Sequence, residues 1–285
     1  MNEKCLNFTE LVVVHNEDKD TNAMKNNRVI EHIVDWLKNY ASTNKMNGFV
    51  VGVSGGIDSA LTSTLCAKTG LPTLCLEMPI KQKKNQVDRA QNHIEWLKKN
   101  YPNVTGKRIS LDPLFKTFSE LTSQDDDSDA ALLSLANSRA RMRMLTLYYY
   151  AARHRYLVAG TGNKVEDFGV GFYTKYGDGG VDISPIADLM KTEVWALAKS
   201  LGVASEIILA PPTDGLWDDD RNDEDQLGAT YKELEWAMKQ HDAGKTLDDF
   251  AGREKTVMQI FLKHHNTNKH KMDPIPVCKI HDELR

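Results

Sequence analysis

The residues most suited to chemistry stand in a glycine-rich turn that follows an apolar, β-branched run. Residues 54–59 read SGGIDS, after the run at 49–53 and before a helix-compatible segment at 60–68. Backbone N–H groups at the start of a helix bind phosphate, and glycine lets a ligand approach the backbone closely. The turn lacks the Gly-Lys-Ser/Thr of a P-loop and the spacing of a dinucleotide fingerprint. It therefore predicts a phosphate site of another kind, or else an ordinary glycine-rich turn.

A second glycine-rich turn, residues 160–164, also follows a short apolar run, and Glu166 stands just after it. Asp58 lies in the first turn, so two carboxylates accompany two candidate phosphate loops. Oxygen ligands beside a triphosphate suit Mg²⁺, and the pair predicts a magnesium site. The alternatives are that Asp58 caps a helix and that Glu166 is an ordinary surface acid.

Two further stretches concentrate charge. Residues 137–143 read NSRARMR, so Arg139 and Arg143 share a helical face from which Arg141 points away. That face is either solvated or suited to bidentate binding of phosphate or carboxylate. Residues 174–182 read TKYGDGGVD, with one cation and two acids among three glycines. This density of charge and glycine favours a loop shaped around a ligand.

The elements that position these residues alternate between strand and helix. Apolar runs predict strands at 49–53, 71–78, 104–111 and 156–159, with a further short strand at 11–14. Helical spacing predicts helices at 28–40, 60–68, 87–99, 130–153, 191–201, 226–239 and 250–264. This alternation predicts an α/β fold: a doubly wound, mostly parallel sheet with helices on both faces. Ligands of such sheets bind at the carboxyl ends of the strands, where both glycine-rich turns would lie. We expect residues 1–26 to be an N-terminal extension and 27–285 to be a single domain.

The overall composition argues against several functional classes. The 285-residue chain has a formal net charge of −4, which gives no sign of a nucleic-acid partner. Its four cysteines include no CxxC pair, so a zinc site is not expected. The first residues lack the apolar core of a signal peptide, and no apolar run reaches membrane-spanning length. We therefore expect a reduced, cytoplasmic protein that does not bind membranes.

The SGGIDS turn resembles the SGGxDS loop of the ATP pyrophosphatases, which cleave ATP between its α and β phosphates. Together with other stretches it makes the chain resemble the NAD synthetase family, in its ammonia-dependent form. The matching stretches are, in order, NSRARMRM at 137–144, GTGNKVE at 160–166, TKYGDGGVDISPI at 174–186, Lys191, PPTDGLW at 211–217 and the pair His270 and Lys271. The TKYGDGGVD stretch discriminates this family from other ATP pyrophosphatases.

The resemblance implies a Rossmann-like fold of ATP pyrophosphatase type and a ligase activity. The implied reaction is the ATP-dependent amidation of deamido-NAD (nicotinate adenine dinucleotide) by ammonia, through an acyl-adenylate. The residues implied to bind ATP are Gly52, Val53, Ser54, Gly55, Gly56, Ile57, Asp58, Ser59, Thr161, Lys191 and Thr213. Mg²⁺ would be held by Asp58 and Glu166, and deamido-NAD by Arg141, Lys175, Asp182, His270 and Lys271. Asp178 and Lys191 would act in catalysis, and the family implies a homodimer that shares the dinucleotide site.

Several points stay open. The segment between Glu166 and Thr174 is one residue longer than the family pattern, so either Glu166 or Asp167 is the metal ligand. The arginine helix reads Asn-Ser-Arg where Ile-Lys is usual. Residues 211–225, with Trp217, favour a mobile lid over the alternative of a disordered surface loop. Only 48 residues precede the first strand of the site, so we expect no glutamine amidase here, and as nitrogen donor either free ammonia or ammonia from a separate protein. The alternative functions are another ATP pyrophosphatase, GMP synthetase-like or tRNA-modifying, or a non-catalytic nucleotide sensor.

Overall fold

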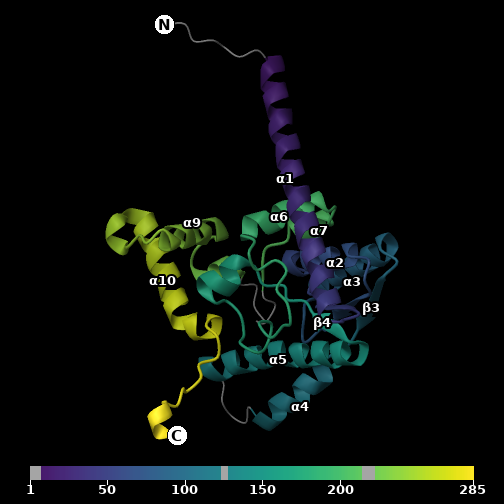
Figure 1. The fold of residues 1–285 in the computed structure, drawn as a ribbon, viewed down its shortest axis with the longest axis vertical. Coiled ribbons are helices and arrows are strands. Elements are labelled where there is room, and N and C mark those ends of the chain that lie inside the picture. Colours follow the sequence, from purple (N-terminus) through teal and green to yellow (C-terminus); the bar gives the residue numbers. More distant parts are fainter. Residues whose placement is uncertain (1–7, 123–127, 214–221) are drawn as a thin grey trace.

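The computed structural model describes residues 8–122, 128–213 and 222–285, and for residues 8–23 the backbone alone (Figure 1). Within this described part, four strands form one parallel sheet in the order β3-β2-β1-β4. They are β1 Gly48–Gly52, β2 Thr73–Glu77, β3 Val104–Arg108 and β4 Tyr156–Val158. From β1 the chain adds β2 and then β3 on one side of β1, and it then crosses to the other side to form β4. The carboxyl ends of β1 and β4 therefore flank the point where the strand order reverses, which is where such sheets bind ligands.

Helices cover both faces of the sheet because β1 is apolar on both sides. Phe49 and Val51 pack against α1 Phe8–Thr43, α2 Ile57–Lys68 and α6 Lys191–Ser200. Val50 packs on the opposite face, against α4 Asp112–Thr122 and α5 Asp129–His154. The helix α3 Lys84–Asn100 covers β2 and β3 on the α2 side. The prediction of a doubly wound parallel sheet is confirmed.

A helical layer follows the sheet in sequence and packs around a short π-helical turn, η1 Val165–Val170. Its main members are α8 Asp223–Leu227, α9 Tyr231–Asp242 and α10 Gly252–Met272. Figure 1 shows α9 and α10 together on the side of the molecule away from β3. Shorter elements are α7 Ser205–Ile208, η2 Leu247–Asp249 and η3 Asp282–Leu284.

Two of the predicted elements are wrong. Residues 11–14 belong to the long helix α1, because a short apolar run alone does not distinguish a strand from a helical turn. Residues 226–239 form two helices instead of one. Gly228 ends α8 in a left-handed conformation, with φ +80°, and Thr230 caps the start of α9. The helix α1 is continuous through residues 26 and 27, and the division into an extension and a domain stays a prediction. Among the described helices, none is both long enough and apolar enough to cross a membrane.

The first residue of β1 allows a test of how closely the central strands pack. A Cβ atom on Gly48 would stand 2.0 Å from the carbonyl oxygen of Pro72, which accepts a hydrogen bond from the Phe49 N–H. A Cβ on Gly106 of β3 would instead meet a methyl group of Ile94, which can move. We expect Gly48→Ala to lower the free energy of unfolding by about 3 kcal/mol and Gly106→Ala by about 1 kcal/mol. Urea denaturation measures both, and equal losses would contradict this account.

Candidate active site

A cavity of about 270 Å³ opens at the carboxyl ends of β1 and β4, and all three glycine-rich loops meet around it. Every residue predicted to contact ATP lines this cavity except Gly55. The backbone of Gly55 packs on α3 instead, with φ +84°, and a Cβ there would stand 2.5 Å from the carbonyl oxygen of Gln86. A side chain at this position would displace the loop, which explains the glycine.

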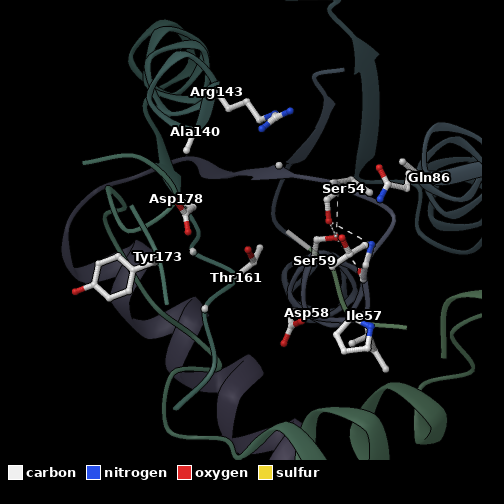
Figure 2. A pocket seen from close by; sticks show the side chains of 18 of the residues that line it. Ser54, Ile57, Asp58, Ser59, Gln86, Ala140, Arg143, Thr161, Tyr173 and Asp178 are labelled. Carbon is white, nitrogen blue, oxygen red and sulfur yellow. Dashed lines mark hydrogen bonds between the residues drawn. The ribbon is translucent and has the colours of Figure 1, made fainter. Parts of the chain in front are cut away.

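The two serines of the first turn fix its shape through hydrogen bonds, as Figure 2 shows. The Ser59 hydroxyl donates to the Gly56 carbonyl at 2.9 Å and accepts from the Ser54 N–H at 3.2 Å. The Ser54 hydroxyl accepts from the Gly56 N–H at 3.2 Å. Gly56 is the N-cap residue of α2, and no described side chain caps that helix end. The first N–H groups of α2 are thus left for an anion in the cavity.

Asp58 belongs to a buried ion cluster and does not cap the helix. The Lys191 ammonium lies 2.6 Å from Asp58 Oδ2 and 3.0 Å from Glu166 Oε1, and its side chain is only 2% exposed. Burial raises the pKa of Asp58, and the Lys191 charge opposes that shift. Burial likewise opposes the charge of Lys191, but the two carboxylates prevail and raise its pKa. The cluster brings two carboxylates from distant segments to one point on the cavity wall.

Asn163 of the second glycine-rich turn and Tyr231, neither of which was predicted as a site residue, hold the two carboxylates in place. The Asn163 amide donates to Asp58 Oδ1 at 3.0 Å, and the Tyr231 hydroxyl donates to Glu166 Oε1 at 2.6 Å. The Tyr231 ring also lies under the Lys191 ammonium, 4.7 Å from it. No spacing in the sequence links Tyr231 to the two carboxylates. Tyr231 falls inside the helix predicted over 226–239, whereas it is the first residue of α9.

The start of α6 is fixed by a residue from α9 that the sequence also did not suggest. The buried carboxylate of Glu235 accepts from the Thr192 N–H and from its hydroxyl, both at 2.8 Å. Thr192 directly follows Lys191, the first residue of α6. By bonding Thr192, Glu235 fixes the backbone position from which the Lys191 side chain extends. A buried carboxylate with both oxygens bonded is a firm anchor.

Asp178 lies on the wall opposite the first turn, with Thr161 between them (Figure 2). Its carboxylate accepts a hydrogen bond from the Thr174 N–H at 3.0 Å, which folds the TKYGDGG loop back on itself. Thr213 lines the cavity at the end of the described chain that precedes residue 222. Trp217, the predicted anchor of a lid, lies outside the described residues, and the lid stays a prediction.

The arginines of α5 have different environments. Arg143 lines the cavity and donates to the Met78 carbonyl and to Gln82 Oε1, both at 3.1 Å. Arg139 is buried over the ring of Phe115, 4.8 Å from its centre, and packs within the fold. The face that they share is therefore neither solvated nor wholly a ligand surface.

The residues predicted to contact deamido-NAD lie outside this cavity. Three of them form a chain: the Arg141 guanidinium donates to the Lys175 carbonyl at 3.3 Å, and the Lys175 ammonium donates to the His270 carbonyl at 2.7 Å. Lys271 donates instead to two carbonyls of the loop that precedes residue 174. Asp182 is not part of this chain, because its carboxylate accepts from the Val158 N–H and the Tyr148 hydroxyl.

Comparison with known proteins agrees with this geometry. A family model described as NAD synthase matches residues 29–275. The chain belongs to the NAD synthase family. A protein named NH(3)-dependent NAD(+) synthetase, from Carboxydothermus hydrogenoformans, is 37% identical over 229 residues, which are 78% of this chain and 89% of that protein.

Two solved structures share the NAD synthase fold over most of both chains. One is titled NMN synthetase from Francisella tularensis, with a TM-score of 0.77 and 32% identity, covering 90% of this chain and 99% of that one. The other is an NH3-dependent NAD synthetase from Campylobacter jejuni in complex with the nitrate ion, with a TM-score of 0.71 and 27% identity. The Campylobacter match covers 89% of this chain and 99% of the other.

The two candidate metal ligands, Glu166 and Asp167, lie in the π turn η1. A π turn contains more residues than an α turn, since each N–H bonds five residues back. Here the Gly171 N–H closes the turn on the Glu166 carbonyl. Both acids line the cavity: Glu166 meets Lys191, while Asp167 lies against Gly162, where a Cβ would overlap its carboxylate. Burial, followed by the charges of Glu166, Asp178 and Asp58, raises the pKa of Asp167 to about 8.

The raised pKa of Asp167 predicts how stability depends on pH. The folded protein keeps this proton up to a pH of about 8, whereas the ordinary carboxyl releases it near 3.8. The unfolded chain therefore binds fewer protons between these values, and the free energy of unfolding falls as the pH rises through this range. We expect Asp167→Asn to flatten that fall and to be more stable than wild type at pH 8. Urea denaturation at pH 5, 6.5 and 8 measures this, with the exposed Asp88→Asn as control. Parallel curves for wild type and Asp167→Asn would contradict the prediction.

Proposed function

We propose that this NAD synthase amidates deamido-NAD with ammonia at the expense of ATP and releases NAD, AMP and pyrophosphate. The observation that carries the proposal is the cavity itself. It is lined on one side by a helix N-terminus suited to phosphate and the adjoining Asp58–Lys191–Glu166 cluster, and on the other by the TKYGDGG loop. Proteins that it resembles over most of their length are named for the same activity.

The first step makes the nicotinate carboxylate a better acyl donor. Without activation, the leaving group of the nicotinate carboxylate would be oxide, which is a poor leaving group. A carboxylate oxygen therefore attacks the α phosphorus of ATP. The bond between the α phosphorus and the oxygen bridging to the β phosphate breaks, and pyrophosphate leaves. The N–H groups at the start of α2 and the Lys191 ammonium stand where they can stabilise the negative charge on the departing group.

Mg²⁺ fits the cluster that Asp58 and Glu166 form. Hard divalent cations take oxygen ligands, and Mg²⁺ typically combines one or two carboxylates with phosphate oxygens and water. Glu166 shares Lys191 with Asp58 and Asp167 does not, which supports Glu166 as the second ligand. When bound, the ion supplies positive charge that neutralises the phosphates. Lys191 holds the two carboxylates together at this point.

In the second step ammonia attacks the acyl carbonyl and AMP leaves. The attacking nitrogen must lose a proton, and Asp178 faces the cavity from the wall opposite the phosphate loop (Figure 2). Its carboxylate can orient ammonia and take that proton, which is the role of a general base. Arg141, Lys175, Asp182, His270 and Lys271 remain the proposed contacts of the dinucleotide.

Asp178→Asn tests the second step. We expect NAD formation at saturating ammonium to fall about 100-fold, because the amide cannot accept the proton. The KM for ATP should change little, since Asp178 stands away from the phosphate loop. Initial rates of NAD and AMP formation measure both effects, and unchanged turnover would remove this role from Asp178.

A homodimer is proposed as well. Leu145 and Tyr149 stand exposed at a spacing of four on α5, in line with Arg141, and form an apolar stripe beside a predicted contact of deamido-NAD. A second copy packed there would complete the dinucleotide site. Sedimentation equilibrium of wild type and of Leu145→Glu tests this proposal, and a wild-type monomer at assay concentrations would overturn it.

The substrate is tested by mass spectrometry of the products formed from ATP, Mg²⁺, ammonium and either deamido-NAD or nicotinate mononucleotide. The mononucleotide is included because the Francisella structure is titled NMN synthetase. We expect NAD as the preferred product, and no product when glutamine replaces ammonium. Preferred amidation of the mononucleotide would make this chain an NMN synthetase. ATP binding without pyrophosphate release would indicate a nucleotide sensor.

A further inference from the structure

One face of α10 is bonded to the segment that leaves the π turn. His265, Asn268 and Lys271 follow one another at intervals of three residues, so they share a face of the helix. His265 Nδ1 donates to the Gly169 carbonyl at 2.7 Å, and the Asn268 amide donates to the Val170 carbonyl at 2.8 Å. The Lys271 ammonium donates to the carbonyls of Gly171 and Tyr173, both at 2.9 Å. Four carbonyls within five residues of backbone are thus bonded by one helix.

These carbonyls need partners that the segment cannot supply for itself. The last carbonyls of a helix find no donor within it, and a buried carbonyl without a donor costs free energy. Gly169 and Val170 are buried, and Gly171 turns the chain into an irregular loop with φ +63°. The fit is close as well, because a Cβ on Gly171 would stand 2.4 Å from the Cβ of Asn268.

The bonded segment lies between two groups with different roles in the proposed reaction. Glu166 precedes the segment and contacts Lys191. Asp178 follows it and lies on the cavity wall opposite the phosphate loop. Tyr173, whose carbonyl Lys271 holds, itself lines the cavity. A shift of this segment would therefore change the distance between the carboxylate cluster and Asp178 while leaving the phosphate loop in place.

We propose that Asn268 is a positioning residue, and that with His265 and Lys271 it holds residues 169–173 so that Asp178 meets the activated acyl group. The inference rests on the proposed function. Loosening the segment would let water reach the acyl-adenylate, and water attack releases AMP and returns deamido-NAD in place of NAD. Loss of position therefore gives AMP formation without amide formation, which loss of stability does not.

The test is Asn268→Leu, which keeps the size of the side chain and removes the donor. Asn266→Leu is the matched control, because Asn266 is exposed two residues away on the same helix. Asn268→Gln restores an amide donor. We expect Asn268→Leu to form NAD about tenfold more slowly, to raise the ratio of AMP to NAD severalfold above one, and to leave the KM for ATP within twofold. Asn268→Gln should lower that ratio toward one, and Asn266→Leu should behave as wild type.

Hydrogen exchange of the backbone amides of residues 171–180 gives a second measurement that needs no activity. We expect at least tenfold faster exchange there in Asn268→Leu, and no change in β1 or in the Asn266→Leu control. Unchanged protection, or AMP and NAD rates that fall in parallel, would overturn the inference. A wild-type enzyme that forms no NAD would overturn the proposed function alone, since the exchange measurement still decides the role of Asn268.

Discussion

The site depends on Lys191, a buried cation that lies between two carboxylates. Removing a charge from water is costly, and an ion pair offsets that cost only with close geometry and further hydrogen bonds. Both conditions hold here: Asp58 also accepts from Asn163, and Glu166 also accepts from Tyr231. Removing one partner of a buried pair typically costs about 3–5 kcal/mol, because it leaves the other charge buried without compensation. The cluster thereby joins α2, η1 and α6, which are far apart in sequence, at the cavity wall.

The two parts of the fold divide the work of positioning. The sheet and α2 place the phosphate loop, whose glycine and serines form its bonds locally. The helical layer supports other parts of the cavity wall. Glu235 of α9 fixes the start of α6, and the row on α10 holds the chain after η1. A ligand between the walls therefore meets one surface built by strand-to-helix turns and another held by helices that come later in the sequence.

Sequence reasoning succeeded where the determinants are local. The SGGIDS turn is recognisable because the strand before it, the glycines and the helix after it are adjacent, and the sheet follows from apolar runs separated by helices. It failed where the determinants are distant. Tyr231 and Glu235 support the cluster from α9, and nothing in their spacing points to Lys191. Gly228 reads as a helix interior until its left-handed conformation separates α8 from α9. The order of family motifs did place Lys191 and Glu166 in one site, but their contact became visible only in three dimensions.

The π turn η1 brings two neighbouring acids to the most constrained group of the site. Glu166 meets Lys191, and the next residue, Asp167, also faces the cavity. A further negative charge there would repel a triphosphate. The raised pKa of Asp167 removes this conflict near neutral pH, because the protonated carboxyl adds no charge and can donate a hydrogen bond. Burial and the neighbouring acids make a charged carboxylate unfavourable at Asp167, and by raising its pKa they keep its carboxyl group neutral.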